Sequence, residues 1–277
     1  MRLFDLLQEK QRAVALTETV KATEDDHPLL YTIPHAGTEA PNPLVNQWNL
    51  GEKALRDTDM HTEKLYTFPR GSTVSTDLNR YVVNMNRPLP EGTPVEVYED
   101  EDAIRTFLKG MEKSWEEPIP QHWKQRLLQA YHEYHEAIQY FLHRSRSVHG
   151  YVFLVTCHSM NAEADTNTPD IGSRPDISLC TDHGTSTTEG VVRAMQSVCE
   201  DSYLHAQINT PYAGGFTTET YAEPDQDIHG IQIEVNKSTY MDESSFSYHP
   251  EKARRVRSVM KNAVQEGLNV LQKQYHG

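Results

Sequence analysis

The run YVFLVTCHS at residues 151–159 constrains the fold more than any other segment of this chain. It is almost continuously apolar and rich in β-branched and aromatic side chains, which is typical of a strand buried on both faces. Directly before it, at residues 120–146, apolar side chains recur every three or four positions, which predicts a long amphipathic helix. A helix that leads into a doubly buried strand is characteristic of layered α/β sheets.

Similar periodicities extend this pattern over the chain. Further strands or extended segments are expected at residues 13–20, 28–34, 72–79, 80–87 and 230–236. Helices are expected at residues 52–66, after the capping-box pair Ser186 and Glu189, and at residues 251–274. Turn-rich loops are expected at residues 174–186 and 211–221. The alternation predicts an α/β fold with a mixed, mostly parallel sheet and helices on both faces, in one domain over residues 1–277.

The charge balance excludes some partners. The formal net charge is −14, from 40 acidic and 26 basic side chains. Nucleic acids and anionic membranes bind clustered Lys and Arg, so neither is expected as a partner. The three cysteines show no paired spacing that predicts a disulfide framework. Because no signal peptide and no apolar run of about 18 residues is seen, we expect a cytoplasmic protein.

Two histidines follow apolar runs at the expected ends of strands. His35 comes after LLYTI, and His158 comes after YVFLVTC. Ligands of open α/β sheets bind beyond the carboxyl ends of the strands, so both imidazoles are expected on the ligand side. Either histidine alone fits a hydrogen-bonded core residue, but the pair favours a metal. Catalytic zinc commonly binds two His and one carboxylate and keeps one open position.

The third metal ligand is less certain from the sequence. Asp57 and Asp59 lie near the start of an expected helix, where acidic residues also complement the helix dipole. Glu39 lies four residues after His35. Spacing alone does not choose among these three carboxylates.

Three further charged residues are candidates for the chemistry. Glu234 is the only charged residue in the strand-like segment GIQIEVN, and a carboxylate there is costly to bury unless it is paired or ligated. It could serve as a general base on water, or simply face solvent on an edge strand. Arg80 and Arg87 bracket the segment RYVVNMNR, and arginine suits a carboxylate or a developing oxyanion because it donates two parallel hydrogen bonds.

Seven segments in this order resemble the N-formylglutamate amidohydrolase (deformylase) family. They are IPHAGTEAP, DTDMHTEKLY, LNRYVVNMNRP, TCHSMNA, PDISLCTDHGTS, PYAGGFTTETY and IHGIQIEVNKSTYM. The resemblance implies a three-layer phosphorylase/hydrolase-like α/β fold related to zinc carboxypeptidases. It also implies one divalent metal ion, with zinc as the expected metal, and hydrolysis of an N-formyl or other N-acyl amino acid, as in histidine degradation.

The resemblance also assigns roles to individual residues. The metal ligands it implies are His35, Asp59 and His158, so it prefers Asp59 to Asp57 and Glu39. Glu234 matches the general base, and Arg80 matches the group that steadies the oxyanion. The substrate-binding residues that it implies are Asn86, Arg87 and Asp176.

Two segments depart from the family pattern, and they leave the substrate open. Glu219 and Thr220 replace a basic pair of the family, and the segment after NMNRP becomes acidic, with Glu99 to Asp102 as a candidate lid. The alternatives to a deformylase are a carboxypeptidase-like hydrolase of another N-acyl amino acid or small peptide, and a non-catalytic ligand-binding protein. The sequence leaves the oligomeric state open.

Overall fold

The computed structural model describes residues 19–40, 55–89, 121–164 and 173–277. The strands are β1 (Val20–Thr23), β2 (Leu29–Ile33), β3 (Ser72–Thr76), β4 (Val152–Met160), β5 (Ile177–Cys180), β6 (Ala206–Ile208), β7 (Ile228–Asn236), β8 (Met241–Asp242) and β9 (Ser247–Tyr248). The α-helices are α4 (Thr62–Leu65), α6 (Gln121–His149), α7 (Glu189–Asp201), α8 (Phe216–Tyr221) and α9 (Pro250–His276). Short 3₁₀ turns span Asp182–Gly184, Pro224–Gln226 and Lys237–Thr239.

The strands form one mixed sheet and one small hairpin. The order in the sheet is β1-β3-β2-β4-β7-β5-β6, and β8 pairs with β9 separately. The pairs β2–β3, β2–β4, β4–β7 and β5–β6 are parallel. Within this sheet the pairs β1–β3 and β5–β7 are antiparallel, and β8 and β9 are antiparallel in their separate hairpin. The predicted mixed, mostly parallel sheet is therefore confirmed.

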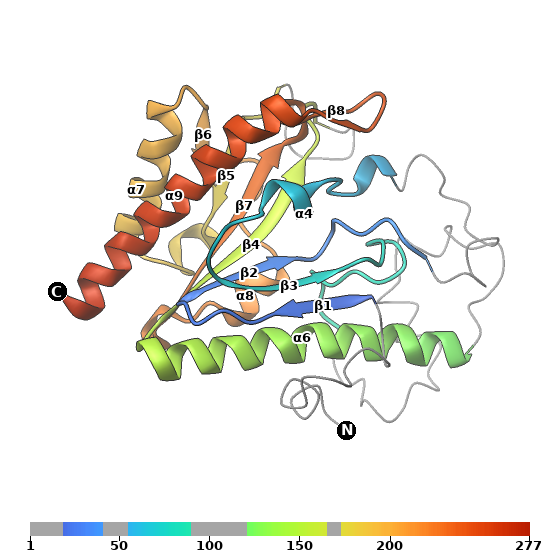
Figure 1. The fold of residues 1–277 in the computed structure, drawn as a ribbon, viewed down its shortest axis with the longest axis horizontal. Helices are drawn as coiled ribbons and strands as arrows, with labels where there is room; N and C mark the ends of the chain where they lie inside the picture. The colour runs from blue at the N-terminus through green and yellow to red at the C-terminus, as the bar shows by residue number, and fades with distance from the viewer. Residues whose placement is uncertain (1–18, 41–54, 90–120, 165–172) are drawn as a thin grey trace.

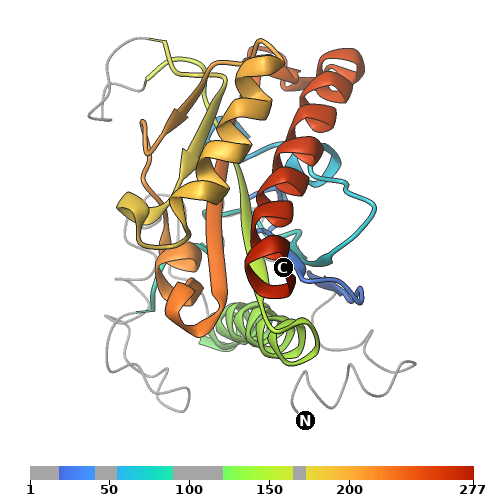
Figure 2. The ribbon, with the colours of Figure 1, turned by 90° about the vertical axis from the view of Figure 1, so that its left-hand side faces the viewer.

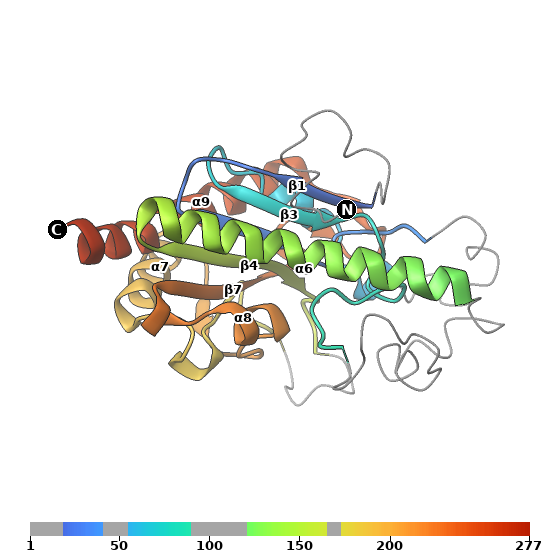
Figure 3. The ribbon, with the colours of Figure 1, turned by 90° about the horizontal axis from the view of Figure 1, so that it is seen from below.

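Helices cover both faces of the sheet and give three layers. α6 runs along one face, and α7 and α9 lie together on the other (Figures 1 and 3). Figure 2 shows α6 nearly end-on, with α7 and α9 running past it. The side chains of β4 alternate between two cores: Leu154 packs on the α6 side, whereas Phe153 and Val155 pack on the side of α7 and α9. All nine residues of β4 are buried, as expected for a central strand.

The long helices follow from their apolar periodicity. Tyr134, Ile138 and Phe141 of α6 lie three or four residues apart and are buried against the sheet. α9 begins with Pro250 in its first turn, and the side chain of His249 accepts a hydrogen bond from the amide of Lys252. Both helices extend slightly beyond the expected residues 120–146 and 251–274. None of the helices in the described ranges is long and apolar enough to span a membrane.

Several local expectations were wrong. The segment 80–87 contains turns and no strand, because the side chains of Asn79 and Asn84 accept hydrogen bonds from the backbone amides of Tyr81 and Asn86. The expected helix 52–66 is interrupted: among its described residues, 55–57 and α4 are helical, and His61 takes a left-handed backbone conformation directly before α4. The expected loops 174–186 and 211–221 contain β5 and α8.

For two other elements, the observed start differs from the expected one. Most of the strand expected at residues 13–20 lies outside the described residues, and β1 begins at its last residue and spans Val20–Thr23. The expected helix is present as α7, but it begins at Glu189 and Ser186 is not its N-cap, because the hydroxyl of Ser186 donates to the carbonyl of Gly230. Its N-cap residue is Thr188.

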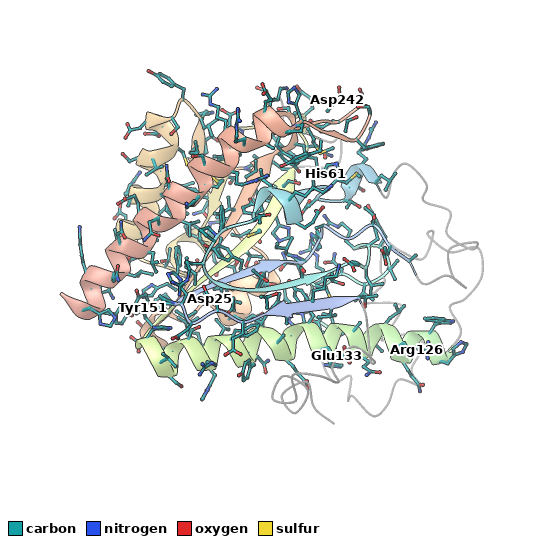
Figure 4. All side chains as sticks on the ribbon, viewed as in Figure 1. Asp25, His61, Arg126, Glu133, Tyr151 and Asp242 are labelled. Carbon is teal, nitrogen blue, oxygen red and sulfur yellow. The ribbon has the colours of Figure 1, made fainter. Side chains whose placement is uncertain are left out.

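The carboxyl ends of β4 and β7 point toward the β8–β9 hairpin (Figure 1). The hairpin is tied to the segment before α4 by His61, whose Nε2 lies 3.0 Å from the carbonyl oxygen of Phe246. Figure 4 labels His61 and Asp242, which belong to these two segments. This end of the sheet therefore gathers residues from several distant parts of the sequence.

Candidate active site

The sheet brings His35, His158 and Glu234 to one edge. β2 ends at Ile33, two residues before His35. His158 and Glu234 are direct partners in the parallel β4–β7 ladder. His158 lies near the carboxyl end of β4, which continues to Met160, as the sequence predicts. β7 lies between β4 and β5, so Glu234 is not on an edge strand and is only 7% exposed.

Asp59 joins the two histidines. Its Oδ2 lies 2.8 Å from Nδ1 of His158 and 3.7 Å from Nδ1 of His35. One ligand atom from each of the three residues lies within 4.8 Å of the others, and all three residues are buried. Nδ1 of His35 has no hydrogen-bond partner although it is buried. Two imidazole nitrogens and one carboxylate form a donor set that fits zinc, and the unpartnered Nδ1 fits a missing ligand bond.

Two asparagines fix how the histidines are protonated. Oδ1 of Asn84 accepts from the amide of Asn86 and lies 2.7 Å from Nε2 of His35, so Nε2 of His35 carries its proton and Nδ1 offers a lone pair. Oδ1 of Asn86 accepts from the amide of Thr217, which leaves Nδ2 of Asn86 3.0 Å from Nε2 of His158. The hydrogen bond from His35 to Asn84 is of the kind that orients the imidazoles of metal sites.

The alternative third ligands lie elsewhere. The carboxylate of Asp57 accepts a hydrogen bond from the hydroxyl of Tyr81. Glu39 is exposed, and its backbone bonds to the segment after β3. Among the described residues, Asp59 alone completes a three-residue cluster with His35 and His158.

Glu234 is held in place from its own strand. Gln232, two residues earlier and on the same side of β7, donates through Nε2 to Oε1 of Glu234 at 2.9 Å. Oε1 of Gln232 lies 3.5 Å from Nδ2 of Asn86. A chain of side-chain hydrogen bonds thus runs from His158 through Asn86 and Gln232 to Glu234.

Burial sets the electrostatics of the site. It raises the pKa of Glu234 to about 7, against the positive charge of Arg80, so this carboxyl exchanges its proton near neutrality. Burial, with the nearby Arg80, lowers the pKa of His35 to about 3 and keeps the imidazole neutral, the form that binds metal. Burial opposes the ionisation of Asp59, but its hydrogen bond with His158 and the closeness of the His35 imidazole hold its pKa below the usual range.

The other candidate residues surround this cluster unevenly. Arg80 is half-buried, donates to the carbonyl of Asp57 at 3.3 Å, and acts electrostatically on both His35 and Glu234. The side chain of Arg87 is exposed. Asp176 lies just before β5, and its carboxylate accepts from the amide of His205 at 2.9 Å. The structure therefore brings together His35, Asp59, His158, Glu234, Asn86 and Arg80, but not Arg87 or Asp176.

Sequence reasoning missed Asn84, Gln232 and Lys237 at this edge. Gln232 had a signal, because it shares with Glu234 the period of two that places side chains on one side of a strand. Asn84 and Lys237 had none, since their neighbours come from distant segments.

Comparison with known proteins identifies the family of this chain. The family model "N-formylglutamate amidohydrolase" matches residues 27–241. N-formylglutamate deformylase of Pseudomonas aeruginosa is 32% identical over 257 residues, covering 87% of this chain and 92% of that protein. The enzyme of the same name from Pseudomonas putida is 31% identical, covering 86% and 91%. This chain belongs to the N-formylglutamate amidohydrolase family.

The family membership confirms the resemblance seen in the sequence. As a member, the chain is a hydrolase that acts on amide bonds. Its fold is shared with the crystal structure of N-formylglutamate amidohydrolase from Ralstonia eutropha, with a TM-score of 0.77 at 19% identity over 93% of this chain and all of that one.

The departure from the family pattern at residues 219 and 220 lies away from the cluster. Thr220 lines a cavity of about 470 Å³ with Arg146, near the end of α6, and Ile228, the first residue of β7. Glu234 lies six residues further along β7, near its other end. Residue 220 therefore has no place beside the three candidate metal ligands. The acidic stretch 99–102 lies outside the described residues.

Proposed function

We propose that this amidohydrolase removes the formyl group from an N-formyl amino acid, with N-formyl-L-glutamate as the leading substrate, and that it needs a divalent metal ion. The observation that carries the proposal is the convergence of His35, Asp59 and His158 beside Glu234. The names of the two Pseudomonas relatives support the substrate. Formate and the free amino acid would be the products, which suits histidine degradation in the cytoplasm.

The three-residue cluster would hold the ion. Two imidazoles and one carboxylate favour zinc over magnesium or calcium, which prefer oxygen ligands alone. When bound, zinc would act as a Lewis acid on the formyl oxygen and lower the pKa of water.

The remaining steps belong to the side chains of this chain. Glu234 accepts a proton from the attacking water and returns it to the leaving amine, because its pKa near 7 suits both transfers. Arg80 supplies positive charge where the formyl oxygen becomes negative. Asn86 orients the α-carboxylate of the substrate, whereas Arg87 and Asp176, the other substrate-binding residues that the resemblance implies, lie outside the cluster.

Activity assays with controlled metal content test this function. Purified protein treated with a chelator should release no formate from N-formyl-L-glutamate, and added zinc should restore release. A panel of N-formyl and N-acetyl amino acids separates a deformylase from a hydrolase of other N-acyl groups. Full activity in protein shown by elemental analysis to be metal-free would contradict the metal dependence.

A further inference from the structure

A second cavity lies beside the candidate metal cluster. It has a volume of about 460 Å³, and its lining includes Arg56, Asn161 and Lys237 together with residues of the β8–β9 hairpin. Arg56 lies three residues before Asp59, Asn161 three residues after His158, and Lys237 three residues after Glu234. The segments that carry Asp59, His158 and Glu234 therefore also contribute to this cavity.

The ammonium group of Lys237 is buried at this cavity. Lys237 is 3% exposed, and its Nζ donates to the carbonyl of Arg56 at 2.7 Å and to Oδ1 of Asn161 at 2.8 Å. Both acceptors are neutral, and no carboxylate of the described residues forms an ion pair with Nζ. Burying a cation with neutral partners alone is costly.

The nearest acidic groups do not neutralise it directly. The carboxylate of Glu243 also lines the cavity, but both of its oxygens face the amide of Ala162, at 3.1 and 3.3 Å. Glu163 is exposed at the rim. Burial lowers the pKa of Lys237, whereas the charges of Asp59 and Glu243 act against this. A carboxylate that enters the cavity would supply the missing partner.

We propose that Lys237, with Arg56 at the rim, binds the side-chain carboxylate of the substrate. Two of the three N–H groups of Nζ are used to hold it in position, which leaves the third for a ligand without further ordering of the side chain. The substrate is thus an N-formyl amino acid with an acidic side chain, and its second carboxylate enters this cavity. The assignment rests on the proposed function, because it places the scissile amide at the cluster of His35, Asp59 and His158.

The test compares N-formyl-L-glutamate with N-formyl-L-glutamine, which has the same shape but no charge on the side chain. In Lys237→Met, kcat/KM for the glutamate substrate should fall about 100-fold or more, whereas kcat/KM for the glutamine substrate should change less than about threefold. Lys261→Met, at an exposed lysine on α9, is the matched control and should change neither. An equal loss for both substrates would overturn the proposal, because Lys237 would then only tie the three segments together.

Two further measurements test the subsite even if the Lys237 variant does not fold. They also separate a failure of the subsite from a failure of the proposed function. Arg56→Glu changes an exposed side chain and should lower the glutamate-to-glutamine preference about tenfold; an unchanged preference speaks against the subsite. Calorimetry with L-glutamate and L-glutamine tests binding without turnover, and wild-type protein should bind L-glutamate more tightly, with the difference lost in Lys237→Met. If wild-type protein releases formate from neither substrate, the proposed function fails, while equal binding of the two amino acids refutes the subsite alone.

Discussion

Glu234 is the residue on which the proposed proton transfers depend. It is 7% exposed, faces His158 across the β4–β7 ladder and is hydrogen-bonded by Gln232. Its carboxyl is therefore both held in position and poised to exchange a proton near neutral pH.

Replacing Glu234 by Gln should remove turnover and leave metal binding intact. The amide keeps the size of the side chain but accepts no proton, so kcat should fall about 10²–10⁴-fold. Formate release and metal content by elemental analysis check this together. Glu219→Gln, at an exposed position on α8, is the control and should keep full activity. An active Glu234→Gln enzyme would remove Glu234 from the mechanism.

At the residue scale, the sequence identified the site residues whose position relative to an apolar strand is recognisable. His35, His158 and Glu234 follow or interrupt apolar runs, and the structure brings all three together. The choice of Asp59 needed the family resemblance, because Asp57 and Glu39 have equally suitable spacing. Asn84 and Lys237 could not be found, since their partners lie 49 and 181 residues away in the chain.

At the scale of elements, α6 carries a buried histidine that couples folding to pH. His135 packs among Tyr131, Phe216 and Tyr221, and its Nδ1 lies 2.9 Å from the Tyr221 hydroxyl. Burial lowers the pKa of His135 to about 3. Between about pH 3 and 6.5 the unfolded chain binds a proton at His135 that the folded protein does not. The free energy of unfolding should therefore increase as the pH rises through this window and decrease as the pH falls through it.

His135→Phe should flatten this pH dependence. The contribution of one proton is about 1.4 kcal/mol per pH unit, and the variant should lack it between pH 5 and 6. Urea unfolding at several pH values measures the slope. His143→Gln, at an exposed position of the same helix, should keep the wild-type slope. An unchanged slope in His135→Phe would mean that other groups cause the acid sensitivity.

The turn after β2 depends on a glycine. A Cβ at Gly37 would lie 2.3 Å from the carbonyl carbon and oxygen of Asp77 and 2.5 Å from the carbonyl oxygen of Leu78. These are backbone atoms that cannot rotate away, so Gly37→Ala should destabilise the fold by about 1–3 kcal/mol. Since His35 is two residues away, activity should fall as well.

The control for this substitution is Gly190→Ala on α7. A Cβ there would meet only Cγ1 of Val270, at 3.4 Å. Since alanine also favours a helix by up to about 1 kcal/mol, this variant should be neutral or slightly more stable. Chemical denaturation of both variants measures the difference. Equal stability of the two would show that the turn can shift to admit a side chain.

Elements were predictable where one physical cause dominates. α6 and α9 have a long 3.6-residue apolar period, and both appear within three residues of their expected ends. The extended segment predicted at residues 80–87 was wrong. Val82 and Val83 suggest a strand, but the side chains of Asn79 and Asn84 accept hydrogen bonds from nearby backbone amides and turn the chain. β5 was missed because ISLC is short and flanked by turn residues.

At the scale of the whole molecule, the site joins β4, β7, the turn after β2 and the loop before α4 into one unit. A ligand that binds the folded form alone stabilises it by mass action. Zinc at 100 times its dissociation constant should raise the free energy of unfolding by about 2.7 kcal/mol. Urea unfolding of chelated and zinc-loaded protein measures this rise. Asp59→Ala should lose most of it, and an equal rise in this variant would place the ion elsewhere.

The order of the strands in the sheet could not be predicted from the sequence. The alternation of elements indicates an open α/β sheet with helices on both faces, but not that β5 runs antiparallel to β7. That pairing brings the start of β5 to the carboxyl end of β7, where the amide of Asn236 donates to the carbonyl of Asp176 at 2.9 Å. It depends on long-range contacts that leave no periodic signal in the chain.

The position of β4 also decides how long the site persists in solution. β4 lies between β2 and β7, and its nine residues are all buried, so its amides are expected to exchange with deuterium only when the whole molecule opens. β1, at the border of the sheet with alternating half-buried and exposed residues, is expected to exchange through local fraying. Because His158 lies on β4, partial unfolding at the border leaves it in place. The lifetime of the catalytic arrangement is then the lifetime of the folded protein itself.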